Sequence, residues 1–272
     1  MRPPFAYYGG KTRLAARIVP LIPKHRIYIE PFAGSLAVLL SKKPCTHEVV
    51  NDLDGDVINF WRQLRERPDE LARVCWATPY ARDEYAAAAE PATDDLERAR
   101  RWWVRINQSH GRTNTTAGWS TGFARSGSRA METQNSARRI EQVAERLRRV
   151  TIENRDALDC IRAYDSPEAV IYVDPPYPGE ARNSVGYRHE MPQAEQHRKL
   201  AAVLQECQGT VLLSGYRCPL YDDLFAGWGA LELDAIKSNG GREGAIGKTT
   251  EVIWSNRPLD SHEQMELGVV SA

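Results

Sequence analysis

The segment AVIYVDPPYPG places a carboxylate, two prolines and an aromatic ring directly after an apolar run. Residues 169–173 are apolar and partly β-branched, which predicts a buried strand. Pro175 and Pro176 cannot donate to a sheet ladder, so the strand must end at Asp174. A strand end with a rigid turn would explain the prolines, but not Asp174 together with Tyr177. The segment is therefore a candidate catalytic motif.

Two other predicted strands also end in acidic residues. Residues 26–30 end at Glu30 and lead into the turn PFAGS, and residues 47–51 are followed by Asp52. Folds that alternate strands and helices bind ligands at such strand ends, and nucleotide-binding units place a ribose-hydroxyl acceptor about 20 residues after the first turn. Gly34 is the only glycine in the turn, so the turn suits a nucleoside without a diphosphate. The alternative for Asp52 is a cap on the following helix.

The N-terminal stretch FAYYGGKT resembles a phosphate-binding loop only superficially. Phe5 stands where that loop requires glycine, and no predicted strand precedes it. The stretch GGREGAIGKTT fails in the same way, because position 242 is arginine. The aromatic pair and the two glycines still suit a segment that closes over a ligand. In that role Tyr7 would stack on the ligand and Lys11 would pair with a carboxylate.

Positive charge is concentrated in one block of a chain whose net charge is zero. Residues 98–149 contain twelve Arg and three Glu, a charge of +9, and the rest of the chain carries −9. This asymmetry predicts a localised face for a polyanion, and guanidinium groups suit phosphates and base edges. The alternative is a solvated, Arg-rich helical surface.

Strand-like and helix-like segments alternate over most of the 272 residues, which predicts an α/β fold with a doubly wound sheet. The last two strands are separated only by loops and are expected to be antiparallel or at an edge. Residues 61–149 break the alternation with helical and loop-rich sequence. We therefore expect an α/β domain from residues 1–60 and 150–272, interrupted by an insert at 61–149. The strands are expected at residues 26–30, 47–51, 150–154, 169–173, 210–215, 230–236 and 251–256.

Composition excludes several classes of protein. The five cysteines are scattered and never spaced C-x-x-C, and the six histidines form no ligand array, so we expect neither disulfides nor a metal site. No run of about 18 apolar residues exists, so no membrane span is predicted. The N-terminus has no apolar signal core, and we expect a cytoplasmic protein.

Four motifs in order, FAYYGGK, YIEPFAGSLAV, VVNDLD and VDPPY, resemble those of the Dam-type, D12-class (α-group) DNA adenine-N6 methyltransferases. The likeness extends to YRHEM, LLSGY and TEVIWSN. It implies a Rossmann-like sheet that binds S-adenosylmethionine, with the insert as the DNA-recognition domain. The cofactor site that it implies, together with the strand ends above, consists of Tyr7, Lys11, Glu30, Pro31, Phe32, Gly34, Asp52, Asp156 and Asp174. For Asp156 the alternative is a helix cap.

The resemblance gives the DPPY segment a mechanism. The exocyclic amine of adenine is a poor nucleophile, because its lone pair is delocalised into the ring. Asp174 and the Pro175 carbonyl would each accept one N6 hydrogen and turn the lone pair towards the sulfonium methyl group. Pro176 would stiffen the turn, and Tyr177 would stack on a base extruded from the duplex.

The expected partner is double-stranded DNA, with no membrane, no metal and no obligate protein partner. Two competing hypotheses are the same chemistry on another amino group (cytosine N4, RNA adenine or a glutamine amide) and a DNA-binding protein that has lost activity. Asp rather than Ser or Asn before P-P-Y, and an insert placed before that motif, favour adenine in DNA. The candidate DNA contacts are Arg105, Asn107, Arg112, Asn114, Arg125 and Arg129.

Overall fold

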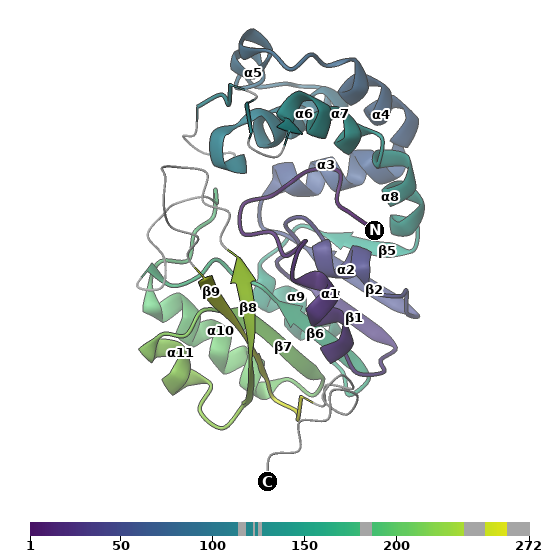
Figure 1. Cartoon of the computed structure of the whole chain (residues 1–272). Helices are drawn as coiled ribbons and strands as arrows, with labels where there is room; N and C mark the ends of the chain where they lie inside the picture. The colour runs from purple at the N-terminus through teal and green to yellow at the C-terminus, as the bar shows by residue number, and fades with distance from the viewer. Residues whose placement is uncertain (114–117, 122, 125–126, 180–186, 237–247, 260–272) are drawn as a thin grey trace.

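Seven apolar runs form the strands of one sheet in the computed structural model of the chain (Figure 1). Their order across the sheet is β5 (Val150–Glu153), β2 (His47–Asn51), β1 (Ile27–Glu30), β6 (Ala169–Val173), β7 (Thr210–Gly215), β9 (Lys248–Ser255) and β8 (Gly229–Ile236). The first five strands are parallel, and β9 is antiparallel to both of its neighbours. The structure describes residues 1–113, 118–121, 123–124, 127–179, 187–236 and 248–259.

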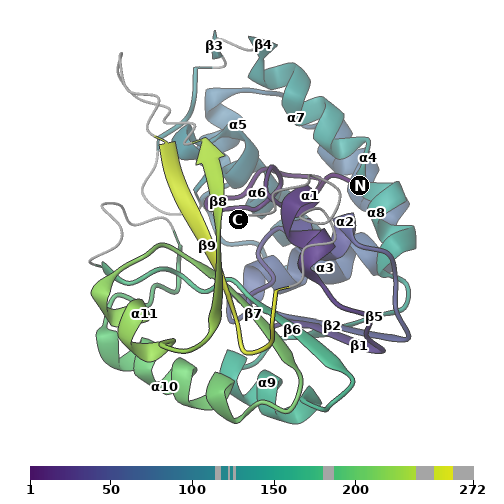
Figure 2. The same ribbon diagram turned by 60° about the horizontal axis from the view of Figure 1, so that its bottom comes forward.

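Strand side chains alternate between two apolar cores, one on each face of the sheet. Tyr28, Val170 and Tyr172 face the first core, and Ile29 and Ile171 face the second. The first core contains side chains of α1 (Ala15–Ile18), α2 (Ala37–Ser41) and α3 (Gly55–Glu66), whereas the second contains those of α9 (Ala157–Tyr164), α10 (Ala194–Glu206) and α11 (Pro219–Leu224). Figure 2 shows the two helical layers on opposite sides of the strands. Each fully buried aliphatic or aromatic side chain contributes about 1.5–3 kcal/mol, so the strand ends are firmly held.

The connection from β2 to β5 contains most of the remaining helices, which gather at one end of the molecule (Figure 1). They are α4 (Pro68–Ala77), α5 (Arg82–Ala87), α6 (Asp95–Gln108), α7 (Arg129–Ala137) and α8 (Ile140–Leu147), with a short turn η2 (His110–Arg112) and the hairpin β3 (Phe123–Ala124) and β4 (Gly127–Ser128). The expected boundary between residues 60 and 61 falls inside α3. Phe60 and Trp61 are both fully buried in the core that also holds Trp102 and Trp103. Helix α3 is thus shared by the sheet and the insert.

The α/β fold and the seven strands are confirmed, including the antiparallel pairing of the last two. β9 begins at Lys248, three residues before the expected start. Helix α1 is short and is followed by a 3₁₀ turn, η1 (Val19–Leu21), which contains Pro20; proline lacks the N–H that an α-helix needs at that point. Among the described residues, no helix is long and apolar enough to span a membrane.

Candidate active site

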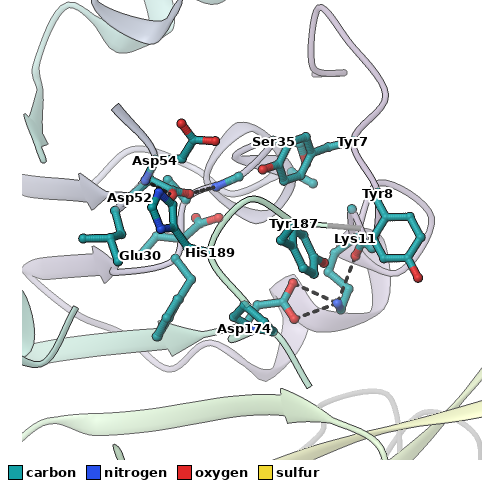
Figure 3. A pocket seen from close by; sticks show the side chains of 18 of the residues that line it. Tyr7, Tyr8, Lys11, Glu30, Ser35, Asp52, Asp54, Asp174, Tyr187 and His189 are labelled. Atoms are coloured by element: carbon teal, nitrogen blue, oxygen red, sulfur yellow. Dashed lines mark hydrogen bonds and ion pairs between the residues drawn. The ribbon is translucent and has the colours of Figure 1, made fainter. Parts of the chain in front are cut away.

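Three parallel strands end in carboxylates around one pocket (Figure 3). β1 ends at Glu30, β2 is followed by Asp52, and β6 is followed by Asp174. β1 lies between β2 and β6, so the chain winds outward in opposite directions from this point, where open α/β sheets bind ligands. The pocket contains about 770 Å³ of space, part of it open to solvent.

Asp174 is joined to the N-terminal segment by an ion pair. The Lys11 ammonium donates to both carboxylate oxygens of Asp174, at 2.7 and 2.8 Å, and also to the carbonyl of Gly9 at 3.1 Å. We expected Lys11 to pair with a carboxylate, and the structure shows that this carboxylate belongs to the chain itself. The pair brings the GGK and DPPY segments, which are 163 positions apart, into one site.

A second carboxylate lies beside this pair. Glu251 of β9 is 3% exposed, and its Oε1 lies 3.3 Å from the Lys11 ammonium. The Tyr177 hydroxyl donates to the same oxygen, and the Ser214 hydroxyl donates to it at 2.6 Å. The Tyr177 ring packs edge-on against Tyr216, with the ring centres 4.6 Å apart. The Tyr177 hydroxyl is therefore fixed by Glu251, and its ring contacts that of Tyr216.

Burial and neighbouring charges shift the acidity of this cluster. Burial raises the pKa of Asp174, the Lys11 ammonium opposes it and Glu251 adds to it, and the resulting pKa is about 6. Burial disfavours the charged form of Lys11, but the carboxylates of Asp174 and Glu251 outweigh it and raise the pKa of Lys11 well above its ordinary value. At neutral pH, Asp174 is therefore an acceptor and Lys11 a donor.

Asp52 supports the turn after β1 and also faces the pocket. Its Oδ2 accepts from the backbone N–H of Gly34 and its Oδ1 from that of Asp54, both at 2.9 Å. Burial raises the pKa of Asp52 to about 6, although these two hydrogen bonds oppose the shift. Each carboxylate oxygen can accept a further hydrogen bond, so Asp52 can still bind a hydroxyl of a ligand. Gly34 adopts φ +43°, a backbone conformation that side chains rarely take.

Glu30 points into the pocket from the end of β1 but is anchored in the core. Its Oε2 accepts from the Tyr28 hydroxyl at 2.9 Å and from the Leu39 N–H at 3.1 Å. Burial raises the pKa of Glu30 to about 8, despite these two donors. At neutral pH this carboxyl is mostly protonated, so it can donate a hydrogen bond into the pocket.

Sequence reasoning missed the residue that holds the turn after Glu30. Asn51, the last residue of β2, is fully buried, and its amide donates to the carbonyls of Pro31 and Arg155, each at 3.0 Å. Its side-chain Oδ1 also accepts from the Arg155 N–H at 2.9 Å. Three adjacent strand ends are thus tied together. The only available signal was an asparagine at the end of an apolar strand.

Residues 187–191 form one wall of the pocket, which the motif YRHEM indicated only through the family likeness. Tyr187 packs against Tyr7 and Tyr8, with ring centres 5.9 and 5.4 Å apart (Figure 3). Arg188 reaches the N-terminus of α3, where its guanidinium lies 3.3 Å from Asp54 and 2.5 Å from Asp56. This wall faces the N-terminal segment across the pocket.

The remaining predicted cofactor and catalytic residues divide into two groups. Phe32 and Pro176 line the pocket, whereas Pro31, Pro175 and Tyr177 are not among the residues that line it. Asp156 is exposed and caps α9 by accepting from the N–H groups of Leu158 and Asp159. It is not among the residues that line the pocket. Its position is that of the helix cap considered as the alternative above.

All four of the described DNA-contact candidates have partners within the insert. Asn107 is buried and donates to the Trp103 carbonyl at 3.1 Å, so its side chain does not face solvent. The other three described candidates contact neighbours as follows: Arg105 stacks over Tyr85, Arg112 pairs with Glu132, and Arg129 donates to the Ser109 carbonyl. Asn114 and Arg125 lie outside the described residues.

Part of the positive block is neutralised by the fold. Arg146 of α8 forms a buried pair with Glu48 of β2, which also binds Lys42. Arg100 pairs with Glu84 and Glu97 on the surface of the insert. These arginines hold helices together, so the charge count of the block overestimates the charge that faces solvent. Within the described residues, no group of three or more His, Cys, Asp or Glu side chains is placed to hold a metal ion.

The pocket lies where the strand order of the mixed sheet reverses, which is where open α/β sheets bind ligands. The chain belongs to the D12 class N6 adenine-specific DNA methyltransferases, because the sequence model of that family matches residues 7–239. It is 25% identical over 276 residues to the Type II methyltransferase M1.LlaDCHI of Lactococcus lactis subsp. cremoris, which covers 94% of this chain and 95% of that protein. The expected enzyme class, adenine-N6 methylation of DNA, is thereby confirmed.

Proposed function

We propose that this chain transfers the methyl group of S-adenosylmethionine to N6 of an adenine extruded from double-stranded DNA. The observation that carries the proposal is the convergence of Glu30, Asp52 and Asp174 on one pocket at the sheet switch point. Family membership gives the reaction, and the pocket supports this cofactor and this mechanism.

The charges around the pocket fit a cationic nucleoside. Four acidic side chains line it, those of Glu30, Asp52, Asp54 and Asp174; the carboxyl of Glu30 is mostly protonated at neutral pH, and Lys11 pairs with Asp174. A diphosphate would need hydrogen-bond donors and positive charge, whereas the ammonium of S-adenosylmethionine needs hydrogen-bond acceptors and its sulfonium is favoured by nearby negative charge. Asp52 would accept the ribose hydroxyls, and the rings of Tyr7 and Phe32 offer apolar surface to the adenosine. When bound, this cofactor supplies an electrophilic methyl group.

Asp174 and the carbonyl of Pro175 would receive the two hydrogens of the amino group. Both acceptors belong to the rigid turn after β6, whose strand is entirely buried, so their positions are set before the base arrives. Asp174 is ionised above its pKa of about 6 and can accept at neutral pH. The nitrogen that loses planarity in this way presents its lone pair to the methyl group. As the new N–C bond forms, the S–C bond to that methyl group would break and leave a neutral thioether, and the amine would pass one proton to the Asp174 carboxylate.

The base must leave the duplex to reach this pocket, because N6 is not accessible in line inside the helix. Tyr177 would then hold the base by stacking. We propose that residues 61–149 recognise the DNA, with Arg105, Arg112 and Arg129 on phosphates or base edges once their present contacts are exchanged. The likeness to a Type II methyltransferase supports site-specific action of the kind that protects DNA from a restriction enzyme.

Product identification tests the proposal. Unmethylated duplex DNA is incubated with S-adenosylmethionine labelled on its methyl group, digested to nucleosides and assayed by mass spectrometry, beside a matched RNA. Label in N6-methyldeoxyadenosine from the duplex, with none in RNA, is the expected result. Label in another nucleoside, or no transfer although the cofactor binds, would contradict it.

A further inference from the structure

Glu251 is a buried carboxylate for which the reaction described above has no task. It lies on β9, an antiparallel strand remote in sequence from the cofactor and DPPY motifs, and its side chain is 3% exposed. An ionised carboxylate in such a position is costly unless it is paired and hydrogen-bonded. Its partners are the Lys11 ammonium and the hydroxyls of Tyr177 and Ser214.

These partners connect Glu251 to both parts of the catalytic motif. Lys11, which is 3.3 Å from Glu251, is the same ammonium that donates to both oxygens of Asp174. Tyr177, which donates to Glu251, also lies 3.3 Å from Asp174 through its hydroxyl. One ammonium is therefore shared by two carboxylates, and one of the two is the proposed acceptor of the amine.

Sharing of this kind lets Lys11 change partners without losing an ion pair. Oδ1 of Asp174 already accepts from both Lys11 and Tyr177, so an amino group that approaches this oxygen must displace one of these donors. Glu251 offers Lys11 a second acceptor within the same buried cluster, so the ammonium can leave one Asp174 oxygen without becoming an unpaired buried charge. The same carboxylate restrains the ring that would stack on the base, because the Tyr177 hydroxyl is fixed.

We propose that Glu251 is a positioning residue for methyl transfer: its buried carboxylate fixes the ring of Tyr177 and takes up Lys11, so that Asp174 can accept the adenine amino group. This inference rests on the proposed function, since it takes Asp174 as the group that receives the amine. It also predicts an effect on the ionisation of Asp174, because a neighbouring negative charge disfavours a second one. Besides Lys11 and Glu251, the titratable groups around Asp174 are Glu30, Tyr172, Tyr177, Tyr216 and Tyr221.

The test compares Glu251→Gln with Glu232→Gln in the full-length enzyme. Glu232 lies on β8, next to β9, but is exposed and pairs with Arg217 outside the pocket. The rate of a single turnover on duplex DNA is measured from pH 5 to pH 8, together with cofactor affinity and the thermal unfolding midpoint. We expect Glu251→Gln to lower the rate about 10- to 100-fold, the size expected for a lost contact between charged groups, with cofactor affinity nearly unchanged. Glu232→Gln should behave as wild type.

The pH at which the single-turnover rate falls in acid, the acid limb of the profile, shows whether Glu251 acts on Asp174 or only stabilises the fold. In Glu251→Gln the limb should move to lower pH, because Asp174 loses a negative neighbour. Glu251→Asp retains the charge, so its limb should stay at the wild-type position even if its rate falls. A variant that has lost cofactor binding and cooperative unfolding would instead assign Glu251 to fold stability and overturn the inference.

The variant Asp174→Ala separates a failure of the Glu251 inference from a failure of the proposed function. If Asp174→Ala is inactive while Glu251→Gln keeps the wild-type rate and acid limb, the inference is wrong and the proposed function stands. If Asp174→Ala still transfers methyl groups, the proposed role of Asp174 is wrong, and the role of Glu251 fails with it.

Discussion

The ammonium of Lys11 lies 2.7 and 2.8 Å from the two carboxylate oxygens of Asp174, and so joins the N-terminal segment to the end of β6. This contact makes the ionisation of Asp174 depend on Lys11. Burial raises the pKa of the carboxyl, Lys11 lowers it, and the balance leaves it at about 6. An acceptor with this pKa is ionised at neutral pH yet loses its function in mild acid.

Lys11→Met should therefore move the acid limb of the rate profile to higher pH. With the ammonium removed, Asp174 retains the burial and the repulsion from Glu251, both of which raise its pKa. We expect a shift of at least about one pH unit, the usual effect of a close opposite charge, together with a slower single turnover at pH 7. Lys24→Met, on the exposed turn before β1, is the matched control. An unshifted limb in Lys11→Met would show that the ion pair does not control Asp174.

Glu30→Gln should stabilise the fold in neutral solution. The folded pKa of Glu30, about 8, exceeds the value of 4.5 typical of an exposed glutamate, so the folded state binds more protons between these two pH values. Stability is therefore lost as the pH rises through this window. Removing the charge should raise the free energy of unfolding at pH 8 by about 1–3 kcal/mol, with little change at pH 4.5.

Urea unfolding of the wild type and Glu30→Gln at both pH values measures this difference, with Glu206→Gln on the exposed end of α10 as the control. The same variant should bind the cofactor more weakly if Glu30 contacts it. Equal or lower stability of Glu30→Gln at pH 8 would show that burial of this carboxyl carries no penalty.

Arg188→Ala should weaken cofactor binding without affecting the fold. Arg188 ties the 187–191 wall of the pocket to Asp54 and Asp56 at the start of α3. Arg217 is an ideal comparison, because its side chain is equally exposed, at 51%, and also pairs with two carboxylates, but it lies outside the pocket lining. Exposed ion pairs contribute about 0.2–1 kcal/mol, so we expect a rise of roughly 2- to 5-fold in the dissociation constant, measured by calorimetry, for Arg188→Ala only. Equal effects of the two variants would refute a role for this wall.

Gly9→Ala should weaken cofactor binding much more strongly than a glycine replacement elsewhere. Gly9 has φ +68°, and a Cβ there would collide with the hydroxyl of Tyr187 across the pocket. Gly227 has φ +87° but open space around its Cα, so Gly227→Ala has the backbone strain without the collision. We expect the cofactor dissociation constant to rise about 10-fold in Gly9→Ala alone, while both variants lose some thermal stability. Similar affinities in the two variants would show that the Gly9 contact with Tyr187 is unimportant.

The sequence predicted the sheet and the position of the pocket because both depend on local patterns. Buried strands ending at Glu30, Asn51 and Val173 were recognisable from their apolar runs, and parallel strands must bring such ends to one edge of the sheet. Contacts made across long separations left no such pattern. Arg188 lines the pocket and Glu251 contacts Lys11 only through the tertiary fold, so neither was named as a site residue, although both lie in the YRHEM and TEVIWSN stretches of the family likeness.

In the insert, the number of charged residues could be counted from the sequence, but that count does not show which charged side chains face solvent. Arg146 contributes to the positive block but is buried against Glu48, and Asn107 has the amide of a base reader but bonds to its own helix. The hairpin β3–β4 has strands of two residues each, too short for any alternation to be visible. Periodicity identifies helices well and identifies their outward-facing contacts poorly.

The most direct test separates the effect of Asp174 on methyl transfer from its effects on cofactor binding and on extrusion of the base. An oligonucleotide duplex that contains the methylation site is prepared in two forms, one with the target adenine and one with 2-aminopurine in its place, whose fluorescence rises when the base leaves the stack. Cofactor binding, fluorescence and single-turnover transfer are measured for wild type and Asp174→Ala. We predict that the variant binds the cofactor and extrudes the base but transfers at a rate at least about 10³-fold lower, because the amine is no longer oriented. Transfer by Asp174→Ala at near the wild-type rate would contradict the central claim that this carboxylate prepares the amine for attack.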